Sequence, residues 1–185
     1  MKHDLRHKAR LVILGNRVDP LNLPTRATVF NGFSVRLLDI IAHRNNLKIL
    51  CGDIGNAFVM AHTKEKVFTV CGKEFGPDRV DAKAVIDKAL YGLCTSAERF
   101  HALLADFLCT LEFNPTVFDR DVWLRDRGDG TGYDYICTHV DNFKIVAKDP
   151  DIWMEKLQDT FVIKSNGPPK YYLSNDYTWV EKRQR

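Results

Sequence analysis

Two long segments of the chain carry apolar residues at the three- and four-residue spacing of an amphipathic helix. The first covers residues 33–44, and the second covers residues 96–111, where the apolar positions form one continuous stripe. We interpret this stripe as core packing. Thr95 and Glu98 have the spacing of a capping box that would begin the second helix. A third, shorter helix is expected from Pro150 to about residue 160, with Asp149 as its N-cap.

Shorter apolar runs, bounded by turn residues, predict strands. They lie at residues 8–14, 47–53, 67–70, 84–89, 122–125, 133–140, 143–147, 161–164 and 171–180. Only Asp141 and Asn142 separate two of these runs, so they predict a tight β-hairpin with Asp141 at its tip. Because helices and strands are mixed without strict alternation, we expect an α+β fold, with an antiparallel sheet and helices on one face.

Composition allows a folded core and leaves the partner open. The chain has 185 residues, of which 45% are hydrophobic, enough for one or two lobes. The formal net charge of +3 permits a nucleic-acid partner but does not indicate one, because domains that bind phosphates are usually more basic. No apolar run approaches the roughly 18 residues of a membrane span, and the N-terminus lacks the apolar region of a signal peptide. We therefore expect an intracellular soluble chain.

The five cysteines are scattered along the chain and include no Cys-x-x-Cys pair. This distribution argues against a disulfide framework and against a zinc site. We expect small apolar side chains in a reducing compartment. Lys144, just after the predicted hairpin, is expected to face solvent, with a contact to a nucleic-acid backbone as the alternative.

Two carboxylates, Asp53 and Asp141, follow apolar strands and are the best candidates for chemistry. If the strands pair, the two acids meet on one rim of the sheet, and like charges held close require a cation between them. Hard divalent ions with oxygen ligands, above all Mg²⁺, suit such a site. The spacing alone favours a structural interpretation, in which Asp53 caps a helix and Asp141 makes a turn.

Four blocks of sequence, through their order and spacing, indicate a resemblance to a known family. They are residues 8–12 (KARLV), 51–58 (CGDIGNAF), 88–93 (KALYGL) and 138–142 (THVDN). Together they resemble the reverse transcriptase, or RNA-directed DNA polymerase, domain of copia-type LTR retrotransposon polyproteins. Weaker similarity at residues 119–123 and 171–176 extends the resemblance over almost the whole chain.

The resemblance implies a single reverse-transcriptase domain, residues 1–185, built from fingers and palm. The fingers would comprise about residues 1–50 and 62–93, and the palm about residues 51–61 and 94–180. The palm would be a ferredoxin-like antiparallel sheet. The thumb and RNase H regions are expected to be absent from this chain, as is the integrase of the parent polyprotein.

The resemblance also implies roles for matched residues. Asp53 and Asp141 would hold two Mg²⁺ ions, with Mn²⁺ as an alternative, and Asn142 would complete the catalytic set. The nucleotide-binding residues would come from three of the blocks. Lys8 and Arg10 would reach the triphosphate of the dNTP, Phe58 would exclude a ribose 2′-hydroxyl, and Tyr91 and Gly92 would line the nucleotide and template side.

Two residues of the predicted hairpin depart from the family pattern. Asn142 stands where the family hairpin carries a second Asp, so it offers a neutral oxygen but no charge. His139 replaces a Tyr, and we interpret it as a packing residue, with a metal ligand or general base as the alternative.

The resemblance implies RNA- and DNA-templated DNA polymerisation by two-metal nucleotidyl transfer, degenerate in this copy. The alternative is a non-catalytic, nucleic-acid-binding remnant. The expected partners are an RNA or DNA template with its primer, and dNTPs, with no membrane. The expected location is a cytoplasmic particle, with the nucleus as a second location.

Overall fold

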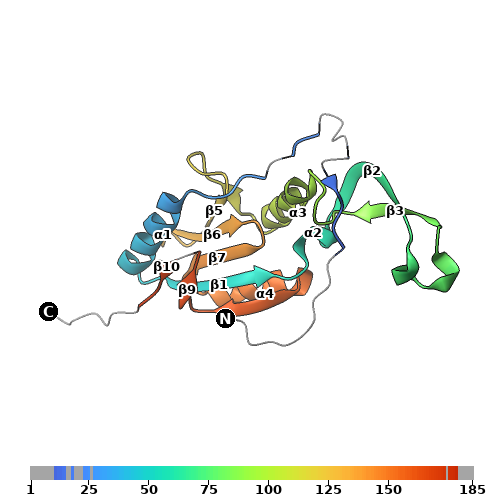
Figure 1. The fold of residues 1–185 in the computed structure, drawn as a ribbon. Helices are drawn as coiled ribbons and strands as arrows, with labels where there is room; N and C mark the ends of the chain where they lie inside the picture. Colours follow the sequence, from blue (N-terminus) through green and yellow to red (C-terminus); the bar gives the residue numbers. More distant parts are fainter. Residues whose placement is uncertain (1–10, 16–17, 19–22, 26, 174, 179–185) are drawn as a thin grey trace. The chain divides into compact units, whose positions relative to one another are not determined.

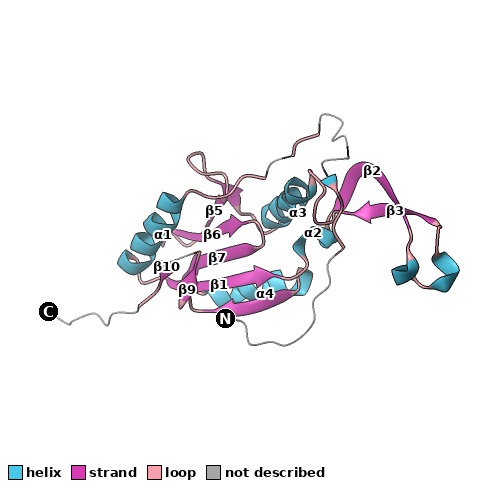
Figure 2. Cartoon of the chain, viewed as in Figure 1, coloured by secondary structure: helices cyan, strands magenta, loops and turns pink. Residues whose placement is uncertain are grey.

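Six antiparallel strands form the main sheet of the protein, in the order β4-β5-β6-β7-β1-β8 (Figures 1 and 2). The strands are β1 (Lys48–Ile54), β4 (Asn114–Pro115), β5 (Val122–Asp126), β6 (Tyr133–His139), β7 (Asn142–Ala147) and β8 (Ile163–Gly167). The computed structural model describes residues 11–15, 18, 23–25, 27–173 and 175–178. The mixed fold with an antiparallel sheet is as predicted.

The chain divides into two compact units, and each is described by itself. The first contains Met1–Ala27 and Ala57–Leu104, and the second contains Thr28–Asn56 and Ala105–Arg185. The main sheet belongs to the second unit. Residues 28–50, expected in the fingers, therefore belong to the same compact unit as the sheet, while the division into fingers and palm stays a prediction.

The strand order follows a ferredoxin-like pattern. Along the chain the elements run β1, α3 (Ser96–Thr110), β6, β7, α4 (Pro150–Thr160), β8, while across the sheet the strands lie in the order β8-β1-β7-β6. This is the β-α-β-β-α-β arrangement, with β7 and then β6 on one side of the first strand and β8 on its other side. The first strand thereby has a neighbour on each side and becomes central.

Helices cover both faces of the sheet, which corrects the prediction of helices on one face. Helix α1 (Gly32–Arg44), drawn blue in Figure 1, packs on one face. Its buried cluster combines helix and strand residues, namely Val35, Leu38, Ala42, Ile49, Val122, Cys137 and Val146. Successive strand residues point to opposite faces, so Asp134 of β6 faces away from Cys137. Asp134 accepts a hydrogen bond of 3.0 Å from the indole of Trp153, which places α4 on the other face.

An ion pair lies buried under α1. The Lys144 side chain is fully buried. Its ammonium donates one hydrogen bond to the Asp39 carboxylate of α1 and a second, of 3.0 Å, to the Tyr177 hydroxyl. That hydroxyl donates in turn to Asp39 at 3.0 Å. Burial lowers the pKa of Lys144, but the hydrogen bonds to Asp39 and Tyr177 outweigh it, so the pKa is raised. The expectation that Lys144 faces solvent was therefore wrong.

Two thiols flank this ammonium on the same sheet face. Lys144 pairs in register with Cys51 on one side and Cys137 on the other. Burial raises the pKa of Cys51 to about 12, and burial also raises the pKa of Cys137. Both side chains are therefore neutral thiols at neutral pH, in agreement with the interpretation of the cysteines as packing residues.

The first unit contains a two-stranded antiparallel sheet. Its elements are α2 (Ala57–Met60), β2 (His62–Val70), the short 3-10 helices η2 (Lys73–Phe75) and η3 (Pro77–Arg79), and β3 (Lys83–Lys88). The strand predicted at residues 8–14 is reduced, within the described residues 11–14, to a single parallel bridge between Val12 and Tyr91. Residues 8–10 lie outside the described residues.

A carboxylate from β2 accepts a hydrogen bond from the backbone at the start of α3. The buried Glu65 of β2 accepts a 3.0 Å hydrogen bond from the Thr95 backbone N–H. The Thr95 hydroxyl is buried and has no hydrogen-bond partner. The predicted capping box of Thr95 and Glu98 was therefore wrong, because Glu65 occupies the position that Glu98 was expected to take.

The last predicted strand is a short hairpin instead. β9 (Tyr171–Tyr172) pairs antiparallel with β10 (Asn175–Asp176).

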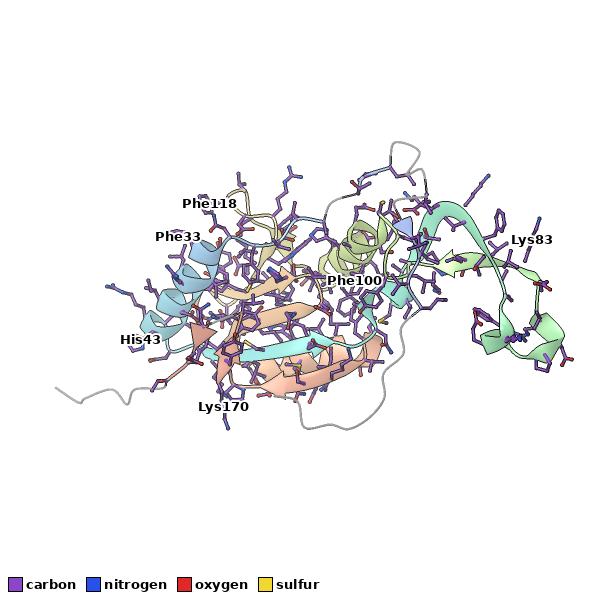
Figure 3. The ribbon with its side chains drawn as sticks, in the orientation of Figure 1. Phe33, His43, Lys83, Phe100, Phe118 and Lys170 are labelled. Carbon is purple, nitrogen blue, oxygen red and sulfur yellow. The ribbon has the colours of Figure 1, made fainter. Side chains whose placement is uncertain are left out.

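An aromatic contact lies at the start of α1, where the rings of Phe33 of α1 and Phe118, both labelled in Figure 3, meet edge to face with their centroids 6.5 Å apart. Within the described residues, no helix combines the length and apolar character needed to cross a membrane.

The buried ion pair gives a stability prediction. Asp39→Asn leaves the Lys144 ammonium buried without a counter-charge, so we expect the free energy of unfolding to fall by about 3 kcal/mol. Lys144→Met leaves the Asp39 carboxylate without its counter-charge, but this side chain is 30% exposed and can be hydrated, so we expect a smaller fall, of about 1–2 kcal/mol. Urea unfolding followed by circular dichroism measures both. The exposed Glu155→Gln of α4 is the matched control, and an Asp39→Asn value equal to that control would contradict the prediction.

Candidate active site

The pairing of β1 with β7 brings the predicted carboxylates together at one end of the main sheet. Asp53 and Asn142 are partners in register, the last pair of this ladder. The Ile54 N–H donates a 2.7 Å hydrogen bond to the Asp141 carbonyl oxygen, which fixes the neighbouring backbone. The two acids are 88 residues apart in the sequence, and the sheet makes them neighbours across adjacent strands.

The hairpin that carries Asp141 turns one residue earlier than expected. β6 ends at His139 and β7 begins at Asn142, so the two turn residues are Val140 and Asp141. Val140 has a φ of +56°, and Asp141 is not among the residues with positive φ. A positive φ at the first turn residue alone is the pattern of a type II′ turn, where glycine is usual. A β-branched residue there is strained, so the surrounding structure must hold this turn.

Charge and hydrogen bonding are unevenly distributed over the site. The Asn142 amide donates a 3.1 Å hydrogen bond to Asp141 Oδ1. Asp53 Oδ1 is buried and accepts no hydrogen bond. The Lys164 ammonium lies 3.6 Å from this oxygen. The lone pairs of Asp53 Oδ1 therefore accept no hydrogen bond from the protein.

The residues fit a hard divalent cation through two carboxylates. Mg²⁺ is commonly held by one or two carboxylates, with waters and substrate phosphate oxygens completing its shell. Asp53 and Asp141 can supply the carboxylates. Among the described residues, no group of three or more His, Cys, Asp or Glu side chains is arranged to hold a metal ion. Asn142 brings an amide to this end of the sheet, where an Asp would bring a third carboxylate.

Packing beneath the site explains the glycine that precedes Asp53. Gly52 pairs with Phe143, and a Cβ at position 52 would lie 2.7 Å from Phe143 Cε1. Real Cβ atoms do not approach a ring this closely, so only glycine fits beneath the Phe143 ring. An aromatic ring over a strand glycine also helps to pin the register of the pair.

His139 is a packing residue. Its ring meets Phe30 edge to face at 5.3 Å, and Phe30 stacks at 6.5 Å on Tyr172 of β9. The aromatic group ties the hairpin to the β9–β10 segment. This agrees with the interpretation of His139 as a replacement for a Tyr.

A groove of about 530 Å³ begins beside Asn142 and follows the edge of the sheet. Its walls come from β1, β7 and the segment from Ser165 to Tyr172. Lys170, labelled in Figure 3, contributes the positive charge of the lining. The groove is open and polar in part, and its lining includes Asn142, the register partner of Asp53.

The residues expected to contact the nucleotide lie in the first unit. The rings of Phe58 in α2 and Tyr91 are 4.9 Å apart, so the structure brings these two together. Gly92 has a φ of +95°, and a Cβ there would overlap the Ile13 carbonyl oxygen. The Ile13 N–H donates a 2.8 Å hydrogen bond to the backbone carbonyl oxygen of Tyr91. The close approach that requires Gly92 is thus made by the chain's own backbone.

Lys8 and Arg10, expected at the triphosphate, lie outside the described residues. Asp53, Asp141 and Asn142 belong to the second unit and Phe58, Tyr91 and Gly92 to the first. The nucleotide-binding roles of these residues stay predictions.

Comparison with known proteins decides the family. Residues 1–179 match the family described as Reverse transcriptase (RNA-dependent DNA polymerase). The chain belongs to the reverse transcriptase family. The resemblance to the copia-type retrotransposon enzyme is thereby confirmed, with retrotransposon polyproteins among its relatives.

Two relatives of this reverse transcriptase are the Retrovirus-related Pol polyproteins from transposons RE1 and RE2 of Arabidopsis thaliana. They are 28% and 26% identical to it, each over 174 residues. Each alignment covers 91% of this chain and 12% of the relative, so the chain spans about 12% of the length of the relatives it matches. No solved structure matches the chain.

Two residues of the candidate site were missed by sequence reasoning. Lys164 lies in β8, and nothing in its local sequence distinguishes it from a solvated lysine. Gly52 was noted only as the end of a strand. A glycine inside an apolar strand signals a close approach, and that signal could have found its contact with Phe143.

The contact between Gly52 and Phe143 gives a prediction about the register of the site. Gly52→Ala forces the methyl group against the Phe143 ring, so we expect the free energy of unfolding to fall by about 2 kcal/mol. In a Phe143→Leu background the same substitution should be at least about 1 kcal/mol less destabilising, because the ring is absent. Urea unfolding of the four proteins in this cycle measures the coupling.

The control is Gly32→Ala at the start of α1, where a Cβ meets nothing within 4 Å. Purely additive effects of Gly52→Ala and Phe143→Leu would show that the ring does not hold the register.

Proposed function

We propose that this chain carries out RNA- and DNA-templated DNA synthesis by nucleotidyl transfer, with activity reduced by Asn142. The observation that carries the proposal is the meeting of Asp53 and Asp141 at one end of β1 and β7, with Asp53 Oδ1 buried and unbonded. Membership of the reverse transcriptase family supports the use of a nucleic-acid template.

Asp53 and Asp141 would hold the divalent cations, two Mg²⁺ ions with Mn²⁺ as an alternative. Bound ions of this kind supply positive charge at the attacking hydroxyl and the leaving pyrophosphate. The protein's part is to fix the two carboxylates on paired strands before substrate arrives, because catalysis of this kind depends on positioning and electrostatics. The hydrogen bond from Asn142 holds Asp141 Oδ1 in place.

Asn142 is the reason for expecting reduced activity. It brings no charge where the family carries a second Asp, so the attraction of the site for cations is weaker. Its amide also occupies one acceptor oxygen of Asp141, and that hydrogen bond must be broken or shared when the carboxylate binds a cation. Both effects act on cation binding rather than on the fold.

In the first unit, Phe58 and Tyr91 would form an aromatic surface for the incoming dNTP, with Gly92 beside it. Phe58 would exclude a ribose 2′-hydroxyl, and Lys8 and Arg10 would reach the triphosphate. The contact of 4.9 Å between the rings of Phe58 and Tyr91 supports a shared site for these two residues. The groove beside Asn142, with Lys170 on its wall, offers a path for the primer strand.

The second candidate function is non-catalytic binding of template and primer, and Asn142 is the observation that favours it. Thumb, RNase H and integrase regions would come from other parts of a parent polyprotein, of which this chain would be a fraction. The proposed location is a cytoplasmic particle, with the nucleus as a second location.

Primer extension on an RNA template with Mg²⁺ and dNTPs tests the proposal. We expect weak extension by the chain as given, at least about tenfold faster extension by Asn142→Asp, and none by Asp53→Asn, because charge at this sheet end attracts the cations. Fluorescence anisotropy of a labelled template-primer gives the binding of each variant.

If all three proteins bind template-primer with the same steep salt dependence and none extends it, the non-catalytic function is correct. If Asn142→Asp extends no faster than the unmodified chain, the missing charge is not what limits activity.

A further inference from the structure

Lys164 reaches Asp53 from a fixed direction. It lies in β8 beside a register shift, since Asp53 pairs with Ser165 while Ile54 pairs with Ile163. A Cβ at Gly55 would lie 2.9 Å from Lys164 Cε and 3.0 Å from its Cγ, so the aliphatic stem of Lys164 packs directly over the Gly55 backbone. The stem is thus held against β1, and the ammonium at its end comes to 3.6 Å from Asp53 Oδ1.

The contact is electrostatic and carries no hydrogen bond. Asp53 Oδ1 has no hydrogen-bond partner, so the Lys164 ammonium compensates its charge without saturating its lone pairs. The Lys164 side chain is 48% accessible, so its ammonium can move into solvent. Another cation can therefore replace the Lys164 ammonium beside the buried oxygen of Asp53.

We propose that Lys164 is a tethered counter-ion that competes with a divalent cation for Asp53 and leaves the carboxylate when that cation binds. The inference rests on the proposed function, because it takes Asp53 as a cation ligand. It adds that the affinity of the site for divalent cations is set by this lysine as well as by the acids.

The charges near the site explain why the competition matters in this chain. Asp53 and Asp141 bring two negative charges, Lys164 brings one positive charge, and Asn142 brings none. The ammonium therefore cancels half of the negative charge that a divalent cation would meet. With an Asp at position 142 the same lysine would cancel only a third.

Mn²⁺ binding measures the competition without any turnover. Bound Mn²⁺ loses the electron paramagnetic resonance signal of the free ion, so titration of the full chain gives a dissociation constant. Lys164→Met removes the charge and keeps an unbranched stem over Gly55. We expect Mn²⁺ to bind about threefold to tenfold more tightly, because a partly exposed charge is screened by water. The gain should shrink as salt is added.

Matched variants separate this effect from a general change of charge. Lys48→Met removes a lysine from the exposed start of the same strand, β1, and should leave the Mn²⁺ dissociation constant within about twofold. Lys164→Arg keeps the charge and should also stay within about twofold. Asp53→Asn should abolish the binding in both the unmodified and the Lys164→Met backgrounds.

The failure of this inference and the failure of the proposed function are distinguishable. If Lys164→Met and the unmodified chain bind Mn²⁺ equally, and Asp53→Asn abolishes both, the lysine does not compete but the cation site stands. If neither the unmodified chain nor Lys164→Met binds more Mn²⁺ than Asp53→Asn does, the carboxylates are not a cation site and both proposals are wrong.

Discussion

The seating of the Phe143 ring on Gly52 is the contact on which the rest of the active-site unit depends. It lies one pair inside the end of the β1–β7 ladder and fixes which residues of the two strands face each other. A slip of one residue would move every side chain of β1 to the opposite face of the sheet. Asp53 would then leave the side shared with Asn142, and Cys51 would leave the side shared with Lys144. One aromatic–glycine contact therefore sets both the site and the packing under α1.

The face beneath α1 is unusual because it combines an apolar cluster with a buried charge. Lys144, Asp39 and Tyr177 satisfy one another's hydrogen bonds inside that layer. The interaction joins three parts of the second unit: the hairpin strand β7, the helix α1 and the segment after β10. A buried pair contributes little net stability compared with apolar packing, but it is intolerant of alternative arrangements. It therefore favours one position of α1 over the hairpin strand, at the base of the site.

The sequence predicts the helices and strands of this chain better than it predicts which of them pair or pack together. Helices α1 and α3 follow from apolar periodicity, α4 follows from the start signal of Asp149 and Pro150, and the hairpin follows from two polar residues between apolar runs. The hairpin turn was placed one residue late, because Asn142 reads as a turn residue but pairs with Asp53 in the sheet. Family resemblance identified Asp53 and Asp141, whereas local spacing allowed a structural role as well.

What the sequence does not reveal is decided by contacts between distant segments. The burial of Lys144 depends on Asp39, which lies 105 residues away along the chain. Glu65 replaces the expected capping residue of α3 from 30 residues upstream. The position of α1 on the face opposite α4 depends on the pairing of all the strands between them. Periodicity shows that such a helix has an apolar side, but not which sheet face will receive it.

The hydrogen bond from Asn142 to Asp141 also bears on how this protein is handled in the laboratory. An Asp at position 142 would set two like charges side by side at a strained turn, so the hairpin would be stabilised by any ion that binds there. The amide instead satisfies its neighbour internally. The hairpin therefore needs no bound ion to offset a second charge, and we expect purification in the presence of a chelator to leave its architecture intact.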